Sequence, residues 1–314
     1  MFDKKKFMFK TIVVLIATLI VLPFIAFKLD PHPVSPEQWH MIEVSGIIAL
    51  ITALSCFTLA EITGNCSQVD KIWSIMPIIY TWYFAYASDW SPRVVLMMVC
   101  ATIWGVRLTY NFSRRGAYKL KFWEGEEDYR WEVLRQNPIF KGKPLNWKLF
   151  NLFFISLYQN GLIWLFSLPP VMAYAGRDKS LGVFDYILAA IFIALVVIET
   201  IADQQQWVYQ NEKHRRLKAG VKPEGEYAVG FVRTGLWARV RHPNYASEQS
   251  IWLVFYLFTI LATGTYINWS MAGCMLLLVL FQGSADFSEG ISLNKYPAYT
   301  DYIKSVPRFL PKFW

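Results

Sequence analysis

The stretch of sequence that decides the fold is FDYILAAIFIALVVIETIA, residues 184–202. A helix of this length is about 30 Å long, which matches the thickness of the hydrocarbon core of a bilayer. Only Asp185 and Glu199 carry a charge within it, one near each end. The stretch therefore predicts a helix that spans a membrane.

Seven further apolar windows of this kind lie elsewhere in the chain, at residues 11–27, 42–62, 73–90, 92–110, 149–174, 249–264 and 267–283. Hydrophobic residues make up 55% of the 314 positions and charged residues 17%, too little charge to cover a soluble domain. Tryptophans near the window ends suit the interface between membrane and water: Trp39, Trp90, Trp147, Trp207 and Trp269. The windows predict an all-α fold, a polytopic membrane helix bundle of about eight transmembrane helices.

The basic residues are distributed asymmetrically between the two sides of this predicted topology. Eight spans place 27 of the 31 Lys and Arg residues on one side, ten of them in residues 107–148 and eight in residues 203–245. Because basic loops stay in the cytoplasm, we expect both termini to be cytoplasmic. The net charge of +8 does not indicate a nucleic-acid partner, since the basic residues lie between hydrophobic spans.

The chain shows no internal repeat or low-complexity stretch, so we expect one integral membrane domain, residues 1–314. Residues 1–62 form its less diagnostic N-terminal helices and residues 63–314 its core. Basic residues precede the first window, as in a signal peptide. Its apolar core is long, however, and no small-residue cleavage site follows, so we expect a retained helix.

The cysteines indicate neither a metal site nor a disulfide framework. Cys56, Cys66, Cys100 and Cys274 show no paired spacing with each other or with histidine, and three of them lie in apolar runs. We interpret them as small buried hydrophobic residues and predict no metal.

Two acidic residues lie near the end of the sixth window. Glu199 and Asp203 are four residues apart and therefore share one face of a helix, where their charges repel each other. A polar ligand such as the hydroxyls of a ribose, or arginines from a neighbouring loop, would relieve this repulsion. The alternative is that both carboxylates are solvated at the interface.

Charged residues also flank the third and fourth windows. Asp70 precedes the third window and fits either a functional role or an ordinary carboxylate at a helix N-terminus. Arg107 lies at the end of the fourth window and forms a basic cluster with Arg114 and Arg115. Three arginines suit a phosphate ligand, although anchoring at the cytoplasmic interface explains them equally well.

The densest polar signal is GLWARVRHPNYASE, residues 235–248, just before the seventh window. Pro243 suits the first turn of a helix, and Asn244 and Glu248 would then share a face that continues into the membrane. His242, with arginines beside it, is suited to titrate or to donate to phosphate. After the eighth window, residues 289–299 predict a short amphipathic return to the interface, with Glu289 facing the same polar pocket or solvent.

Four motifs together resemble the steroid 5α-reductase superfamily and, within it, a bacterial branch. The resemblance covers residues 60–314, and its motifs are Val69-Asp70-Lys71-Ile72-Trp73, Trp104-Gly105-Val106-Arg107-Leu108, Arg241-His242-Pro243-Asn244-Tyr245 with Glu248, and Lys295-Tyr296-Pro297. The arginine-histidine-proline stretch alone is more distantly similar to isoprenylcysteine and phospholipid methyltransferases.

The resemblance implies a membrane enzyme that binds NADPH from the cytoplasmic side. It implies reduction of a carbon-carbon double bond conjugated to a carbonyl in a steroid-like or other lipid substrate. GxGxxG is absent, so any NADPH site is of the membrane type. The cofactor-binding residues that we infer are Arg107, Arg114, Arg115, Glu199, Asp203, Arg233, Arg241, His242, Asn244 and Tyr245.

The resemblance also suggests catalytic residues. Glu248 lies where the family has a residue near the nicotinamide and substrate, and Asp70 takes the place of a glutamate that polarises the substrate carbonyl. The family's partner tyrosine falls near Ile103 or Trp104, so Trp104 is the candidate donor there. Glu199 stands where the family has an asparagine.

Two other functions fit the same sequence. One is a methyltransferase that uses S-adenosylmethionine, with residues 235–248 as its cofactor site. The other is a non-enzymatic transporter or scaffold, although the chain lacks the inverted repeat typical of many transporters. The expected partners are a lipid-like substrate and membrane lipids. The expected location is a bacterial inner membrane, and a eukaryotic internal membrane suits the same topology.

Overall fold

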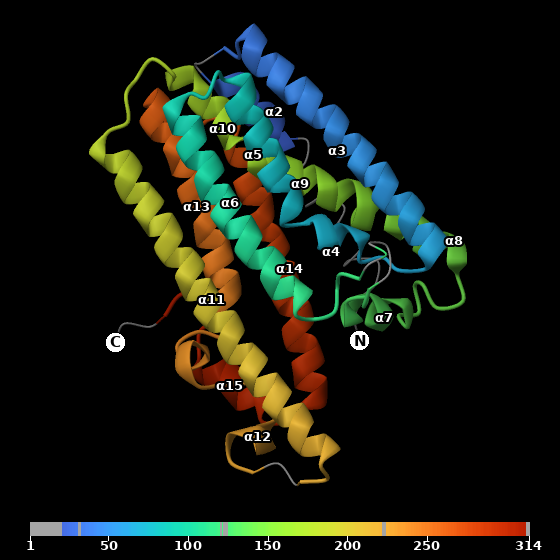
Figure 1. Ribbon diagram of the computed structural model, residues 1–314. Coiled ribbons are helices and arrows are strands. Elements are labelled where there is room, and N and C mark those ends of the chain that lie inside the picture. Colours follow the sequence, from blue (N-terminus) through green and yellow to red (C-terminus); the bar gives the residue numbers. More distant parts are fainter. Residues whose placement is uncertain (1–20, 31–32, 120, 122–124, 222–223, 312–314) are drawn as a thin grey trace. The chain divides into compact units, whose positions relative to one another are not determined.

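The computed structural model describes residues 21–30, 33–119, 121, 125–221 and 224–311 (Figure 1). Over these residues the chain is helical and contains no strand, in agreement with the predicted all-α class. It divides into two compact units. Unit 1 comprises Met1–Ala189 and Phe255–Leu276, and unit 2 comprises Ala190–Val254 and Leu277–Trp314. Because α11, α13 and α14 run through both units, this division leaves the expectation of one domain as a prediction.

The helical elements follow one another in chain order. Their bounds are α2 Leu22–Leu29, α3 Pro36–Thr63, α4 Gln68–Ile72, α5 Ile75–Ala87, α6 Pro92–Ser113, α7 Tyr129–Arg135, α8 Pro144–Phe150, η2 Asn151–Tyr158, α9 Gln159–Ser167, α10 Pro169–Ala173, η3 Tyr174–Gly176, α11 Val183–Lys218, α12 Glu226–Val229, η4 Gly235–Ala238, α13 Pro243–Thr263, α14 Met271–Lys295 and α15 Tyr299–Ser305.

The ends of α3 illustrate how local sequence sets these bounds. Ser35 and Gln38 form a capping box, in which the Ser35 side chain accepts from the Gln38 amide and the Gln38 side chain accepts from the Ser35 amide. Gly64 ends the helix with φ +69°, a left-handed conformation that glycine adopts without strain. Between these caps, residues 44–60 carry no charged side chain.

Six helical segments in the described residues are long and apolar enough to cross a membrane. They are Pro36–Thr63, Pro92–Ser113, Pro144–Gly176, Val183–Lys218, Pro243–Thr263 and Met271–Lys295, and each overlaps one predicted window. The first window, 11–27, lies mostly outside the described residues. The third window contains α5, whose 13 residues are shorter than the roughly 20 that a span needs. The count of eight spans and the cytoplasmic position of both termini stay predictions.

Two helices extend further than the sequence predicts, and a third begins where the sequence predicts. Residues 203–218, expected in a loop, continue α11, because they contain good helix formers and no glycine or proline, and because Glu212 pairs with Arg215 and Arg216. Residues 289–295, expected after the last span, continue α14. α13 begins at Pro243, as predicted.

Close helix packing in unit 1 depends on glycine. A Cβ at Gly105 of α6 would lie 2.6 Å from the Ser74 carbonyl oxygen, and one at Gly273 of α14 would lie 2.2 Å from a backbone carbon of Leu165 in α9. Small residues allow membrane helices to approach in this way. α5 and α6 run side by side (Figure 1) and are joined by a hydrogen bond from Trp82 Nε1 to Thr102 Oγ1, 3.0 Å long.

A buried ion pair also holds unit 1 together. Arg93 of α6 donates from Nε to Asp185 Oδ1 at 2.7 Å and from Nη2 to Oδ2 at 3.1 Å, and both side chains are at most 5% exposed. Asp185 accepts a further bond from the amide of Gly182. These bonds compensate for removing the two charges from water.

Candidate functional site

A partly buried hydrogen bond in unit 2 joins two of the sequence-predicted residues. Asn244 lies in the first turn of α13, because Pro243 begins that helix, and its Nδ2 donates to Asp203 Oδ1 of α11 at 3.1 Å. Asp203 is 6% exposed and Glu199, one turn earlier on α11, is 4% exposed. Both carboxylates are therefore buried rather than solvated.

Gln206 extends this face of α11 by one residue that the sequence pattern did not single out. It lies seven positions after Glu199 and three after Asp203, so the three side chains share one helix face. Its Oε1 is buried and accepts no hydrogen bond from any residue that the structure describes. The face thus presents three side chains rich in acceptors, Glu199, Asp203 and Gln206, beside the amide of Asn244.

Glu248 lies one turn after Asn244 on α13 and is also buried, at 4% exposure. Its Oε1 accepts from Trp252 Nε1 at 2.9 Å. The predicted placement of Asn244 and Glu248 on one helix face is confirmed, because their spacing of four residues falls within α13.

Arg241 and His242 converge on Glu289 of α14. Arg241 Nε donates to Glu289 Oε1 at 2.8 Å, and His242 Nε2 lies 2.9 Å from the same oxygen. The remaining guanidinium nitrogens of Arg241 donate to Glu289 Oε2 and to the carbonyls of Ile303 and Val306. Arg241 is therefore occupied by protein acceptors, which favours a structural role over contact with a phosphate.

The C-terminal segment completes this network. Arg308 Nη2 donates to Glu289 Oε2 at 2.7 Å, and Arg308 Nη1 lies 2.8 Å from Asp286. The amides of Arg241 and His242 donate to the carbonyls of Pro307 and Arg308. Sequence reasoning missed Arg308, although Asp286 and Glu289, three residues apart on one helix, signal a need for a basic partner.

The other two predicted residues of unit 2 differ in burial. The Tyr245 ring stacks on His242 with centroids 5.2 Å apart and meets Phe281 edge-on at 4.9 Å. Arg233 is exposed. Tyr245 thus supports the His242 ring, whereas Arg233 is accessible to a ligand.

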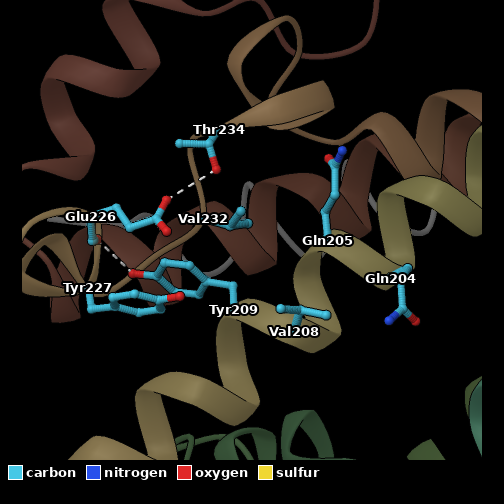
Figure 2. Close-up of a pocket in the computed structure, with 8 residues that line it drawn as sticks. All are labelled: Gln204, Gln205, Val208, Tyr209, Glu226, Tyr227, Val232 and Thr234. Atoms are coloured by element: carbon cyan, nitrogen blue, oxygen red, sulfur yellow. Dashed lines mark hydrogen bonds between the residues drawn. The ribbon is translucent and has the colours of Figure 1, made fainter.

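A pocket of about 270 Å³ lies in unit 2 against α11 (Figure 2). The residues that α11 contributes to it lie on a different side of that helix from Asp203 and Gln206. Tyr209 and Tyr227 stack at its wall with centroids 5.1 Å apart, and Tyr209 donates to the Glu226 carbonyl at 3.0 Å. The pocket contains none of the residues predicted from sequence. Its lining is Gln204, Gln205, Val208, Tyr209, Glu226, Tyr227, Val232 and Thr234.

In unit 1, Asp70 lies on α4 and accepts from Trp131 Nε1 of α7 at 3.0 Å. Burial raises the pKa of the Asp70 carboxyl above its ordinary value. Nearby, Asp128 caps α7 by accepting from the Arg130 amide at 2.9 Å and pairs with the Arg130 guanidinium at 2.8 Å. Burial acts to raise the pKa of Asp128 as well, but the charge and hydrogen bonds of Arg130 outweigh it and lower that pKa.

The remaining predicted residues of unit 1 lie on and just after α6. Trp104 is completely buried, Arg107 is half-buried, and Arg114 donates to Asn111 Oδ1 and lies over the Tyr110 ring. Arg115 is exposed. Of the three arginines, Arg115 is thus the most accessible to an anionic ligand.

The predicted residues fall into both units. Unit 2 brings together Asp203 with Asn244, and Arg241 with His242 and Tyr245. Unit 1 joins Asp70 to Trp131, to which the sequence assigned no role. No group of three or more His, Cys, Asp or Glu side chains in the described residues is arranged to hold a metal ion.

Comparison with known proteins places the chain among relatives. A family model described as "Protein of unknown function (DUF1295)" matches residues 56–306. A protein of the fission yeast Schizosaccharomyces pombe, described as uncharacterized, is 37% identical over 261 residues, covering 80% of this chain and 74% of the relative. No solved structure matches.

Proposed function

This chain belongs to the DUF1295 family, and from that premise we propose that it is a membrane-embedded reductase that uses NADPH. The proposed reaction reduces a carbon-carbon double bond conjugated to a carbonyl in a steroid-like or other lipid substrate. The resemblance to the steroid 5α-reductase superfamily, carried by the motifs around Asp70, Arg107, His242 and Tyr296, supports this choice.

The observation that carries the proposal is the buried polar face of α11. Glu199, Asp203 and Gln206 follow one another along it, Asn244 touches Asp203, and Gln206 Oε1 accepts no bond from the described residues. A buried acceptor without a donor is costly. A ligand that carries several hydrogen-bond donors would satisfy such a face.

The residues present fit the sugar and amide parts of NADPH. Ribose hydroxyls and the nicotinamide carboxamide are donors that suit carboxylate and amide oxygens, so Glu199, Asp203, Gln206 and Asn244 would hold these parts. When bound, the cofactor supplies the reducing equivalent. The acidic face does not suit phosphates, which need cationic partners.

The phosphates require cationic residues, and the predicted arginines differ in how accessible their side chains are to a ligand. Arg241 is occupied by Glu289 and two carbonyls, whereas Arg115 and Arg233 are exposed. Within unit 2 we therefore favour Arg233 over Arg241 as a phosphate ligand. Arg115 is the corresponding exposed candidate of unit 1. For His242, its bond to Glu289 favours a supporting role.

The resemblance proposes a role on the substrate for Glu248 of unit 2 and, separately, for Asp70 and Trp104 of unit 1. Glu248 is buried and oriented by the indole of Trp252, so it can position a donor group in a site from which water is excluded. Asp70 has a raised pKa and can therefore keep a proton to donate toward a carbonyl oxygen. Trp104 can donate a hydrogen bond through its indole N–H but cannot readily release that proton.

Six long apolar helices support a multi-pass integral membrane protein. The location in a bacterial inner membrane remains part of the proposal. The fungal relative is equally consistent with a eukaryotic internal membrane.

The function is tested by following the thermal stability of the purified, detergent-solubilised chain against NADPH, NADH and S-adenosylmethionine. A ligand at 100 times its Kd stabilises a protein by about 2.7 kcal/mol, so a bound cofactor gives a clear rise in Tm. We expect a rise with NADPH. A rise with S-adenosylmethionine and none with NADPH would support the methyltransferase instead.

Turnover provides the second test. Oxidation of NADPH is followed in the presence of lipid enones, for the unaltered chain and for Glu248→Gln. We expect the variant to lose activity while retaining its NADPH-induced rise in Tm. Full activity of Glu248→Gln would remove Glu248 from the mechanism.

A further inference from the structure

The pocket of unit 2 is enclosed between α11 and the segment that contains α12 (Figure 2). Two hydrogen bonds hold this segment against the helix. The Tyr209 hydroxyl donates to the Glu226 carbonyl at 3.0 Å, and the Leu236 amide donates to Gln205 Oε1 at 2.9 Å. Val232 packs against Tyr209, and both are buried. The pocket is therefore a fixed feature of the folded chain.

A single carboxylate gives this pocket its charge. Among the described residues that line it, Glu226 alone is charged. Its Oε2 accepts from Thr234 Oγ1 at 3.3 Å, and it forms no ion pair with any described residue. Glu212, on α11, is in contrast paired with Arg215 and Arg216. The Glu226 carboxylate thus keeps the capacity to bind a cation.

The aromatic residues of the pocket restrict the kind of cation. Tyr209 and Tyr227 stack on each other with an interplanar angle of 20°. The Arg216 guanidinium lies over the Tyr227 ring at 4.3 Å, and the Lys213 ammonium lies over the Tyr209 ring at 5.9 Å. A quaternary ammonium needs open aromatic faces, which these rings do not offer. A primary ammonium fits better, because its three N–H donors match the carboxylate, hydroxyl and amide oxygens of the lining.

The position of the pocket along α11 matches the depth of lipid headgroups. The apolar window ends at residue 202, and α11 lines the pocket from Gln204 to Tyr209. At a rise of 1.5 Å per residue, these positions lie about 3–10 Å beyond the end of the window. The interfacial layer on each side of the hydrocarbon core is about 5–8 Å thick.

An exposed apolar stripe leads from the pocket along the membrane window. Val197, Ile201 and Val208 of α11 are 51%, 45% and 52% exposed. Their spacing places them on the same side of the helix as Gln204, which lines the pocket. Such a stripe suits an acyl chain, so the ammonium group and the chain would belong to one lipid molecule.

We propose that the pocket binds the primary ammonium headgroup of a membrane phospholipid, such as phosphatidylethanolamine, with Glu226 and Thr234 as its acceptors. The acyl chains of the lipid lie along the exposed stripe of α11. The site goes beyond the proposed function, because it lies on a different side of α11 from Asp203 and Gln206 and uses none of the residues proposed to hold NADPH.

The first experiment identifies the ligand by thermal unfolding of the detergent-solubilised chain. The probes are phosphatidylethanolamine, phosphatidylcholine with the same acyl chains, and free ethanolamine. We expect the largest rise in Tm with phosphatidylethanolamine. An equal rise with both lipids, or no rise with either, would overturn the proposal, since the ammonium would not be recognised. A rise with ethanolamine as large as that with phosphatidylethanolamine would overturn the assignment to a lipid.

The second experiment locates the site with variants. Glu226→Gln removes the charge and Thr234→Val the hydroxyl, whereas Glu224→Gln is the control, an exposed position outside the lining. We expect the apparent Kd for phosphatidylethanolamine to increase at least fivefold in Glu226→Gln, to increase less in Thr234→Val and to stay unchanged in Glu224→Gln. An unchanged Kd in both pocket variants, or an equal increase in the control, would overturn the site.

The lipid site and the reductase fail in different ways. Glu226→Gln should keep the rise in Tm that NADPH produces, because the two sites lie on different sides of α11. Loss of both ligands in a Glu226→Gln variant of unaltered Tm would place Glu226 in the cofactor site and overturn the lipid site. Selective binding of phosphatidylethanolamine by an unaltered chain that does not bind NADPH would uphold the lipid site and contradict the reductase.

Discussion

Unit 2 contains two groups of buried acidic side chains that are satisfied in opposite ways. Glu289 receives bonds from Arg241 and Arg308, so its charge is compensated by two guanidinium groups of the protein itself. Asp203 accepts from the neutral amide of Asn244, and on the same helix face Gln206 Oε1 accepts no bond from the described residues. The difference teaches that burial and charge alone do not identify a ligand site. The Glu289 network joins Arg241 and the C-terminal segment to α14. The α11 face, in contrast, has an acceptor that a ligand could use, Gln206 Oε1.

The largest effect is expected in the Glu289 network. Arg241→Ala leaves a buried carboxylate with fewer partners, and breaking a buried pair in this way costs about 3–5 kcal/mol. We expect a corresponding loss in the free energy of unfolding, measured by denaturant titration. Lys304→Ala is the control, because its pair with Asp301 is exposed and should change stability by less than about 1 kcal/mol. A stable Arg241→Ala variant with impaired NADPH binding would contradict this account, because Arg241 would then bind the cofactor and would not be needed for stability.

Gln206→Leu tests the α11 face. It removes an acceptor that has no partner among the described residues, so stability should stay unchanged or increase. If Gln206 accepts from NADPH, affinity for the cofactor should fall about tenfold, the equivalent of a hydrogen bond worth about 1.4 kcal/mol. Calorimetric titration measures this change. Unchanged affinity would show that Gln206 does not contact the cofactor.

Two carboxylates of unit 1 predict opposite pH dependences. Burial raises the pKa of Asp70, so its contribution to stability is present below the unfolded pKa near 3.8 and is lost as pH rises through the higher folded value. Asp70→Asn should therefore stabilise the protein at pH 8 relative to pH 4. A tenfold difference in proton affinity between the folded and unfolded chain corresponds to about 1.4 kcal/mol of stability.

Asp128→Asn is the matched variant of opposite sign. Burial acts to raise the pKa of Asp128, but the Arg130 charge and hydrogen bonds lower it, so its contribution is present above about 3.8 and is lost as pH falls through the lower folded pKa. This variant should destabilise the protein at pH 8. Thermal unfolding from pH 3 to pH 8 checks both signs, and equal pH profiles for the two variants would contradict the assignment.

The smallest effect is expected at Arg233. Its side chain is exposed, so Arg233→Ala should change stability by less than about 0.5 kcal/mol. If Arg233 binds a phosphate, the variant should bind NADPH several-fold more weakly. Equal NADPH affinity for the variant and the unaltered chain would exclude this contact.

Periodicity and residue type predicted much of this molecule. The apolar windows located six long helices, Pro243 marked the start of α13, and the spacing of Asn244 and Glu248 placed them on one face. The sequence did not show that α11 and α14 continue past the membrane windows, because hydropathy falls there. In α11 the helix propensity stays high beyond the window, whereas the end of α14 contains Gly290, Ser292 and Asn294.

Contacts between segments that are distant in the chain could not be predicted from the sequence. The spacing of four between Glu199 and Asp203 indicated a shared face, but nothing in one sequence showed that Asn244 touches Asp203 or that Arg308 reaches Glu289. For the same reason Arg241 was assigned to the cofactor, although the folded chain uses it to hold Glu289 and the C-terminal segment. Which arginines bind phosphate stays a prediction.

The central claim, that the α11 face binds NADPH, is tested most directly by measuring its Kd for the unaltered chain, for Asp203→Asn and for Asp178→Asn. The last variant makes the same chemical change at an exposed position. Losing a hydrogen bond to a charged group costs about 1.5–3 kcal/mol, so Asp203→Asn should weaken NADPH binding roughly 10- to 100-fold, while Asp178→Asn leaves it unchanged. Equal Kd values for all three proteins, or no measurable NADPH binding by the unaltered chain, would contradict the account.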